Sequence, residues 1–171
     1  MQILWGQFYT KVDPDGKGIE NVTFQVKDGG TVLYFVKQGD GFYRKAASAT
    51  TQGATTNVKT DANGKLTFTG LDAAKTYTVT ETERASDVYL DIKPSFTVSF
   101  EKGVAVLSRN ATSDLWGLVD TSRKTVKNVK SITQLPLTGA AGTVLFTIVA
   151  LLLAGAGAAV ALKSRNTLVE S

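Results

Sequence analysis

Hydrophobic and polar residues alternate in short runs along the first 130 residues, and turn residues separate these runs. The runs Val22–Val26 and Tyr77–Glu83 have the two-residue period of a half-buried strand. Turn sequences such as Asp13-Pro-Asp-Gly16 and Asp61-Ala-Asn-Gly64 lie between runs. No stretch before Ala140 keeps the 3.6-residue apolar period of a helix. The pattern predicts an all-β domain of about eight short strands, typical of a β-sandwich. We expect strands near residues 8–12, 22–26, 32–35, 42–43, 66–68, 77–83, 96–100, 104–107 and 125–129, and an exposed loop at 46–57.

One of these runs directs a carboxylate toward the core. In Tyr77-Thr-Val-Thr-Glu-Thr82 the threonines share one face, so Glu81 lies on the opposite face with Tyr77 and Val79. An isolated buried carboxylate is costly, so we expect Glu81 to be protonated or paired, with a raised pKa if desolvation dominates. Alternation alone leaves a second interpretation open, in which this is an edge strand and Glu81 lies at the rim.

The end of the chain has a different pattern. Twenty-three residues without a charge run from Ala140 to Leu162, and Lys163 and Arg165 follow them. As a helix, a segment of this length spans roughly 30 Å of hydrocarbon. Basic residues favour the cytoplasmic side of a membrane, so the pattern predicts that the rest of the chain lies outside the cell.

A short motif, Leu135-Pro136-Leu137-Thr138-Gly139, stands directly before the uncharged segment. Motif, apolar segment and basic tail together resemble the cell-wall sorting signals of Gram-positive bacteria. The resemblance implies that a sortase, a membrane transpeptidase with a catalytic cysteine, cuts between Thr138 and Gly139. The enzyme would then join the Thr138 carbonyl to an amine of peptidoglycan or of a neighbouring pilin subunit, so only the precursor would span the membrane. An ordinary single-pass anchor, with the motif as a juxtamembrane linker, is the alternative.

Composition excludes several kinds of chemistry. The chain has no cysteine and no histidine, which removes disulfides, thiol catalysis and the usual transition-metal ligands and neutral-pH general base. We therefore expect no metal and no cofactor. The net charge of +4 is spread over mixed acidic and basic residues without a basic stripe, so we expect no nucleic-acid partner.

The body of the chain contains Thr-Asp-x-x-Gly and Gly-Leu within Thr60–Leu71, and Tyr-x-Val-x-Glu-Thr at Tyr77–Thr82. These motifs resemble those of collagen-adhesin B-type domains, also called SpaA-like or CnaB-type pilin domains. At the front, Lys11-Val-Asp13 and Ile19–Val26 look like the opening strands of that family, and Val126-Lys-Asn128 looks like its closing strand. The implied fold is an Ig-like, prealbumin-like β-sandwich.

Two positions depart from the family pattern. Asn21 stands where glycine is usual, and Arg84–Asp87 stands where an Ala-Pro-x-Gly turn is expected. The second departure puts the loop after Glu81 in doubt, but not Glu81 itself.

The resemblance also implies a reaction inside the folded domain. In this family a lysine of the first strand condenses with an asparagine of the last strand, releases ammonia and leaves an isopeptide bond, assisted by a buried glutamate. By position, the lysine is Lys11, the asparagine is Asn128 and the autocatalytic glutamate is Glu81. Taken one at a time, Lys11 also fits a solvated strand lysine and Asn128 a turn residue.

These observations predict four parts: a β-sandwich at residues 1–132, a linker with the sortase motif at 133–139, a transmembrane segment at 140–162 and a basic cytoplasmic tail at 163–171. The first residues lack the basic and apolar regions of a signal peptide. We therefore expect the chain to be the C-terminal part of a longer precursor.

The leading hypothesis for function is a structural, non-enzymatic surface protein at the cell wall of a Gram-positive bacterium, either a pilin subunit or the stalk of an adhesin. One alternative is the anchor portion of a wall-attached enzyme whose catalytic domain lies upstream. Another is a binding protein retained in the membrane by a single span. The Tyr-Pro-Lys motif of shaft pilins is absent. Shaft pilin, base pilin and adhesin stalk therefore stay open, as does any ligand in the host extracellular matrix.

Overall fold

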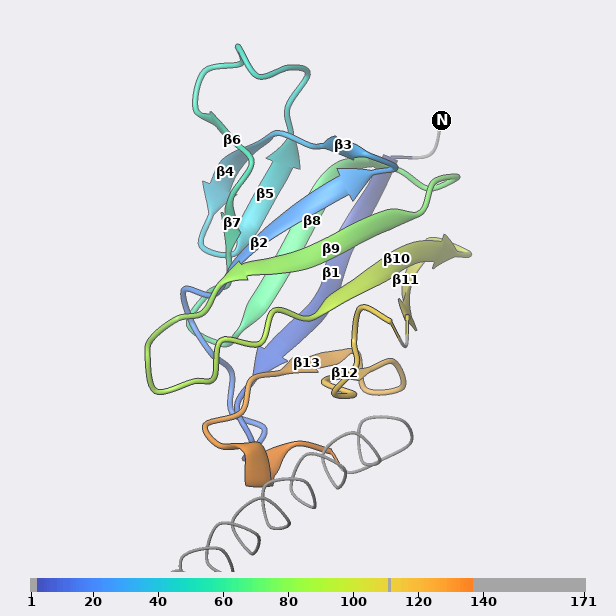
Figure 1. Ribbon diagram of the computed structural model, residues 1–171. Coiled ribbons are helices and arrows are strands. Elements are labelled where there is room, and N and C mark those ends of the chain that lie inside the picture. Colours follow the sequence, from blue (N-terminus) through green and yellow to red (C-terminus); the bar gives the residue numbers. More distant parts are fainter. Residues whose placement is uncertain (1–2, 111, 137–171) are drawn as a thin grey trace, which may run out of the picture. The chain divides into compact units, whose positions relative to one another are not determined.

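The computed structural model describes residues 3–110 and 112–136, and it shows two layers of β-structure (Figure 1). The first sheet has the order β12-β13-β1-β8-β5-β4-β6, and the second has the order β11-β10-β9-β2-β3 with β7 beside β2. One cluster of buried hydrophobic side chains from both sheets forms the main core. The predicted all-β sandwich is confirmed. The strands are β1 (Ile3–Val12), β2 (Thr23–Asp28), β3 (Thr31–Val32), β4 (Phe35–Gly39), β5 (Phe42–Lys45), β6 (Ala54–Thr55), β7 (Val58–Lys59), β8 (Lys65–Asp72), β9 (Tyr77–Glu83), β10 (Ser95–Glu101), β11 (Val104–Arg109), β12 (Val119–Asp120) and β13 (Thr125–Lys127).

Strand β1 departs from simple alternation. Phe8 and Tyr9 are neighbours in the chain, yet each is only 1% exposed. The pairing of β1 with β8 shifts register between Gln7 and Tyr9, which is the signature of a β-bulge. Strict alternation would place Phe8 and Lys11 on opposite faces, whereas both are buried here.

The first and last strands of the domain are neighbours. β13 runs parallel to β1, with Lys11 opposite Val126, and the Asn128 N–H donates to the Val12 carbonyl at 2.9 Å. Figure 1 shows the arrow of β1 ending beside β13. The predicted closing strand is confirmed at Thr125–Lys127, and Asn128 follows its last residue.

One predicted strand, at residues 32–35, is wrong. The hairpin around Gly29-Gly30 forms as predicted, but its second strand is only Thr31–Val32. Phe35 already begins β4, which belongs to the other sheet. The intervening residues carry the chain from one sheet to the other, so a continuous apolar run serves two strands.

The segment at residues 46–57 is more structured than the predicted loop. Ala54–Thr55 forms β6 and pairs with β4, and Ala46 is buried. The short strands β7 and β12 were also not predicted. Two-residue strands carry too few positions for alternation to be visible.

The turn from Thr60 to Gly64 holds the backbone at Lys11. Thr60 Oγ1 donates to the Ile19 carbonyl at 2.7 Å and accepts the Val22 N–H at 3.0 Å. Gly64 has φ +75°, and its carbonyl accepts the Lys11 N–H at 2.6 Å. A Cβ at Gly64 would collide with the Lys11 carbonyl, so glycine is required by both conformation and space.

Both departures from the family pattern have structural explanations. Asn21 has φ +61°, a left-handed conformation that asparagine tolerates better than most residues with a side chain. In the loop after β9, the Arg84 guanidinium donates to the Tyr89 carbonyl at 2.6 Å and to Asp87 Oδ1 at 2.7 Å. These contacts close the loop where the family pattern has a proline and a glycine.

The C-terminal end of the domain forms a second, smaller hydrophobic cluster. After β13 the chain makes a short 3₁₀ helix, η1 (Ile132–Gln134), and reaches Leu135. The first compact unit of the chain ends at Leu135, and residues 136–171 form the second. The cluster consists of buried Leu118, Val129 and Leu135, with Leu90, Ile92 and Trp116 packed against them.

Part of the predicted sorting signal lies outside the described residues. This applies to Leu137, Thr138, Gly139, the uncharged segment at 140–162 and the basic tail. Within the part of the chain that the structure describes, no helix is long and apolar enough to cross a membrane.

Candidate functional site

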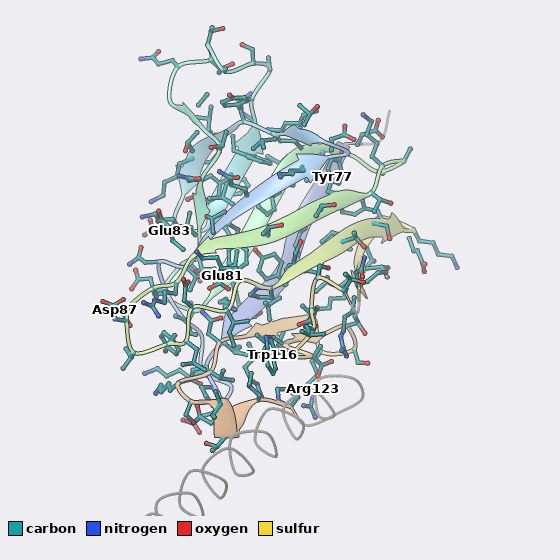
Figure 2. The ribbon with its side chains drawn as sticks, viewed as in Figure 1. Tyr77, Glu81, Glu83, Asp87, Trp116 and Arg123 are labelled. Atoms are coloured by element: carbon teal, nitrogen blue, oxygen red, sulfur yellow. The ribbon has the colours of Figure 1, made fainter. Side chains whose placement is uncertain are left out.

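Three residues that are far apart in the chain meet inside the sandwich. Lys11 comes from β1, Glu81 from β9 and Asn128 from the residue after β13. Lys11 Nζ lies 2.9 Å from Glu81 Oε2, and Asn128 Nδ2 donates to Glu81 Oε1 at 2.9 Å. One carboxylate therefore holds the amine on one oxygen and the carboxamide on the other. Figure 2 shows the position of Glu81 on its strand.

The site is closed to water. Lys11 is 0% exposed, and Glu81 and Asn128 are each 1% exposed. The alternative of Glu81 at an exposed rim is therefore excluded, and the expectation of a paired carboxylate is confirmed. The aromatic ring of Tyr9 packs edge-on against Phe24 and Phe96, with centroid distances of 5.2 and 4.9 Å. Burial of this kind removes the solvation that normally keeps a lysine charged.

The polar capacity of the site is not fully used. Among the described residues, four buried side-chain atoms have no hydrogen-bond partner, namely Tyr9 Oη, Lys11 Nζ, Glu81 Oε2 and Asn128 Oδ1. The contact between Lys11 and Glu81 is thus a close ion pair without aligned hydrogen-bond geometry. Unsatisfied buried polar groups are rare in folded proteins and call for an explanation. Here three of the four atoms belong to the groups that the family resemblance assigns to a reaction.

Burial changes the protonation of the amine. Desolvation lowers the pKa of Lys11 from 10.5 to about 8, and the charges of Glu81 and Asp114 oppose this shift. A neutral, nucleophilic amine is therefore easier to form at Lys11 than at a solvated lysine. Burial, followed by the charge of Glu81, raises the pKa of Tyr9, so its phenol stays protonated.

A second buried carboxylate, Asp114, was missed by sequence reasoning. Its side chain is fully buried, forms an ion pair with Arg109 Nε at 2.9 Å, and accepts the N–H groups of Leu118 at 2.8 Å and Val119 at 3.1 Å. Burial raises the pKa of Asp114, and these hydrogen bonds and the charge of Arg109 oppose that shift. Asp114 lies between strands, where alternation gives no signal.

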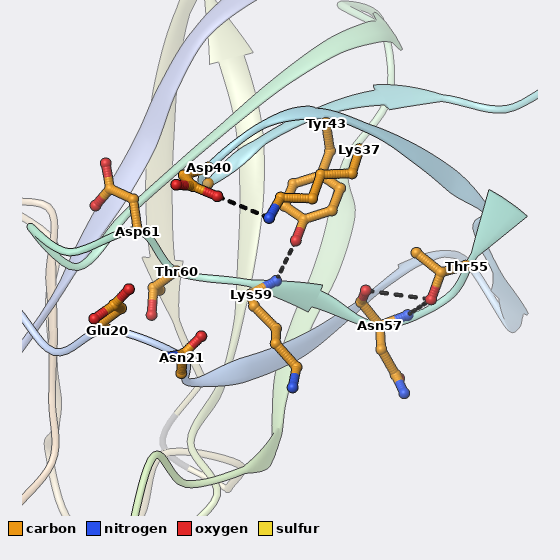
Figure 3. Close-up of a pocket in the computed structure, with 11 residues that line it drawn as sticks. Glu20, Asn21, Lys37, Asp40, Tyr43, Thr55, Asn57, Lys59, Thr60 and Asp61 are labelled. Atoms are coloured by element: carbon orange, nitrogen blue, oxygen red, sulfur yellow. Dashed lines mark hydrogen bonds and ion pairs between the residues drawn. The ribbon is translucent and has the colours of Figure 1, made fainter. Parts of the chain in front are cut away.

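A polar pocket of about 300 Å³ lies away from these residues (Figure 3). Its lining includes Lys37, Asp40 and Tyr43, and these groups already have partners in the protein. Lys37 Nζ contacts Asp40 Oδ1 at 2.8 Å, and the Tyr43 hydroxyl accepts the Lys59 N–H at 2.9 Å. In residues 3–110 and 112–136, no three acidic side chains are grouped so that they could hold a metal ion. Neither feature assigns a function.

The two sheets and their shared core define an all-β sandwich domain. The family profile of the SpaA prealbumin-like fold domain matches residues 8–112, more than half of the chain. The chain therefore belongs to the SpaA prealbumin-like fold domain family, as the motifs predicted. Lys11 and Glu81 lie inside this match, and Asn128 lies beyond it.

A second profile, the LPXTG cell-wall anchor motif of Gram-positive bacteria, matches residues 127–167. The predicted sorting signal is thus confirmed as a motif, and it implies processing by a sortase. The protein is located at the cell-wall surface of a Gram-positive bacterium. No curated protein is similar enough to the whole chain to count as a match.

Solved structures of pilins are similar to this chain at low sequence identity. The shaft pilin spaA from Lactobacillus rhamnosus GG is 19% identical with a TM-score of 0.48, and the match covers 77% of this chain and 48% of that one. The minor pilin GBS52 from Streptococcus agalactiae is 20% identical with a TM-score of 0.44, over 75% of this chain and 46% of that one. The C-terminal domain of the L. rhamnosus pilin is 17% identical with a TM-score of 0.46, over 77% of this chain and all of that domain. This chain thus matches about half the length of the two larger pilins.

Proposed function

We propose that the protein is a structural cell-surface subunit, a pilin or the stalk of an adhesin, stabilised by an isopeptide bond between Lys11 and Asn128. The observation that carries the proposal is the Glu81 carboxylate, which contacts the Lys11 amine and the Asn128 carboxamide at 2.9 Å each. A nucleophile, an electrophile and a shared acid–base group thus lie together in the buried interior of the domain. No external substrate is needed for this chemistry.

The reaction begins with a proton transfer inside the ion pair. Glu81 takes a proton from Lys11, so the amine becomes neutral and the carboxyl group becomes an acid without any proton from solvent. The lowered pKa of Lys11 makes this transfer easier than for a solvated lysine. Burial removes solvation from both charges, so forming the neutral pair costs less here than it would in water.

The Lys11 nitrogen then attacks the Asn128 carboxamide carbon. Rotation of the carboxamide brings Asn128 Oδ1, which has no partner in the structure, toward the Glu81 acid, which can donate to it as negative charge develops. This donation passes the first proton to Oδ1, so the free Glu81 carboxylate next takes the second proton from the attacking nitrogen and gives it to the leaving nitrogen. The Oδ1 proton returns to Glu81 as the carbonyl re-forms. The bond from the Asn128 carbon to Nδ2 breaks, ammonia leaves, and a secondary amide joins the side chains.

Mass spectrometry of the full chain tests the bond. The purified protein should weigh about 17 Da less than its sequence mass, because one ammonia is lost. Glu81→Ala should remove the acid–base group, and Lys11→Ala the nucleophile, and each should restore the sequence mass. Asp114→Asn is the matched control, because it changes a buried carboxylate outside the reacting trio. This variant should still weigh about 17 Da less than its sequence mass. A well-folded wild-type protein at its full sequence mass would overturn the proposal.

We further propose that a sortase joins the subunit through Thr138 to peptidoglycan or to a neighbouring subunit. The match to the anchor motif at residues 127–167 supports this step. In cell-wall digests the mature protein should end at Thr138, now in amide linkage to its acceptor. Thr138→Ala should leave the protein in the membrane or shed into the medium. An intact Thr138–Gly139 bond in wall digests would contradict sorting.

A further inference from the structure

The first residue of the sorting motif is part of the folded domain. Leu135 is 5% exposed and belongs to the second hydrophobic cluster, with Leu118 and Val129. Three further apolar side chains pack against this cluster, namely Leu90, Ile92 and Trp116, the last of which is labelled in Figure 2. By contrast, Ile132, three residues earlier in the chain, is 55% exposed.

Hydrogen bonds from backbone N–H groups hold the segment that carries Leu135. Gln134 Oε1 accepts the N–H groups of Lys130 at 2.8 Å and Ser131 at 3.3 Å, and the Leu135 N–H donates to the Ile132 carbonyl at 3.3 Å. The Leu90 N–H donates to the Val129 carbonyl at 2.9 Å, which ties the same stretch to the loop after β9. The segment is therefore folded against the domain up to the start of the motif.

We propose that this docking masks the sorting motif, so that Leu135 must leave the second cluster before a sortase can bind. The inference rests on the proposed sorting function. An enzyme that recognises the Leu135 side chain has to contact it, and a side chain with 5% of its surface exposed cannot make both sets of contacts. Sortase thus binds a minor, undocked state, and the apparent affinity falls by the fraction of chains in that state.

Asn128 links the mask to the proposed cross-link. Only six residues separate Asn128 from Leu135, and the first of them, Val129, belongs to the cluster. When the last strand is paired, it keeps Leu135 close to the second hydrophobic cluster. When the last strand is unpaired, residues 129–135 are released together. The motif is therefore presented by local opening of residues 129–135 rather than by a free linker.

Chemical labelling tests the docking independently of any enzyme. The chain has no cysteine, so single thiols can be introduced cleanly. In the folded full chain in detergent, the Leu135→Cys variant should react with a maleimide at least tenfold more slowly than the Ile132→Cys variant. Adding Leu118→Ala to the first variant should raise its rate several-fold. Equal labelling rates at both positions would overturn the proposal.

Sortase kinetics test the consequence. The enzyme is chosen for its ability to cut a free peptide of residues 133–142. A full-length variant with Gly-Ser-Gly-Ser-Leu inserted between Leu135 and Pro136 keeps Leu135 docked and offers a second, free motif. It should be cut at least tenfold faster than the wild type.

The matched control inserts Gly-Ser-Gly-Ser-Gly after Ala141, which lengthens the tether but leaves the motif masked, and should not change the rate. Equal cleavage rates for the wild type and the first insertion variant, or equal acceleration by both insertions, would overturn the proposal that docking of Leu135 masks the motif. If no sortase cuts the free peptide, the proposed sorting function fails, and the labelling experiment still decides whether Leu135 is docked.

Discussion

Glu81 and Asp114 are both buried carboxylates, and each has a cation 2.9 Å away, yet their surroundings differ. Asp114 accepts two backbone N–H groups, and Arg109, its partner, keeps its proton at any ordinary pH. Glu81 has a lysine with a lowered pKa and a carboxamide as its partners, and one of its oxygens has no hydrogen bond.

The difference shows which features of a buried carboxylate indicate chemistry. Burial and an ion pair are common to both sites, so neither distinguishes them. Three features distinguish Glu81 from Asp114. Its cationic partner can give up a proton, a carboxamide lies beside it, and one of its oxygens has no hydrogen bond. The polar groups of Asp114 are hydrogen-bonded and hold the chain around β12, whereas the Glu81 site keeps unused hydrogen-bond capacity.

Removing the Glu81 carboxylate should have the largest effect. Glu81→Gln should prevent the cross-link, and the unfolded chain would regain the freedom of the 116 residues between Lys11 and Asn128. By the loop-entropy model of disulfides this is about 4–5 kcal/mol, on the order of 15–20 °C in Tm. Thermal and denaturant unfolding measure both quantities. A Glu81→Gln protein as stable as the wild type would remove the contrast between the two carboxylates.

A double variant separates the lost bond from the lost ion pair. Lys11→Met with Glu81→Gln removes both buried charges and should recover part of the stability that Glu81→Gln loses, because no unpaired lysine is left in the core. It should stay below the cross-linked wild type, since the loop is still open. Full recovery would mean that the ion pair, and not the bond, accounts for the loss.

Asp114→Asn should have an intermediate effect. The variant weakens the contact to Arg109 and to the N–H groups of Leu118 and Val119, and we expect a loss of about 2–3 kcal/mol. The 17 Da mass deficit should persist, because Asp114 does not bridge the reacting groups. Arg109→Lys keeps a cation near Asp114 and should cost less. Loss of the mass deficit in the Asp114→Asn variant would show that the two sites act as one.

A change of pH should alter the free energies discussed here least, but it tests the role of Glu81 most directly. The reactive state of the Lys11–Glu81 pair carries one shared proton, and the pair loses it above the Lys11 pKa of about 8. The rate should therefore fall about tenfold per pH unit well above pH 8, a change of 1.4 kcal/mol in activation free energy per unit. Protein unfolded from inclusion bodies, refolded at each pH and analysed by mass over time, gives the rate.

The opposite pH profile would assign a different mechanism. If a neutral Lys11 amine is all that the reaction needs, the rate should rise up to about pH 8 and then stay level, because deprotonation of the pair would no longer remove an essential acid. That outcome would make Glu81 a group that only positions Lys11 and Asn128.

Much of the fold could be predicted because most strands carry a clear alternation. The alternation in Tyr77–Glu83 predicted that Glu81 shares a face with Tyr77 and Val79, and it left open whether that face lies in the core or at a rim. Lys11 and Asn128 became candidates only through the family resemblance, since single polar residues carry no signal of burial. Their meeting depends on the parallel pairing of β1 with β13, which is a contact between the two ends of the domain.

The features that were missed lie where alternation fails. The bulge that turns both Phe8 and Tyr9 inward adds a residue to one strand, and no local pattern marks it. Asp114 sits in an irregular segment, and its burial depends on Arg109 and on backbone N–H groups. The sequence identified Leu135 only as the first residue of a motif. Its burial depends on Leu118 and Val129, which are its neighbours in the folded structure.

The parallel arrangement of β1 and β13 also determines how the domain would respond to tension. A pull between the start of β1 and the end of β13 acts along both strands in opposite directions, so their hydrogen bonds would be sheared together rather than opened one after another. With Lys11 and Asn128 joined, the force would pass through a covalent bond. The 116 residues between them would then carry no load. Under tension such a subunit is a short inextensible link, and only residues outside the pair would lengthen.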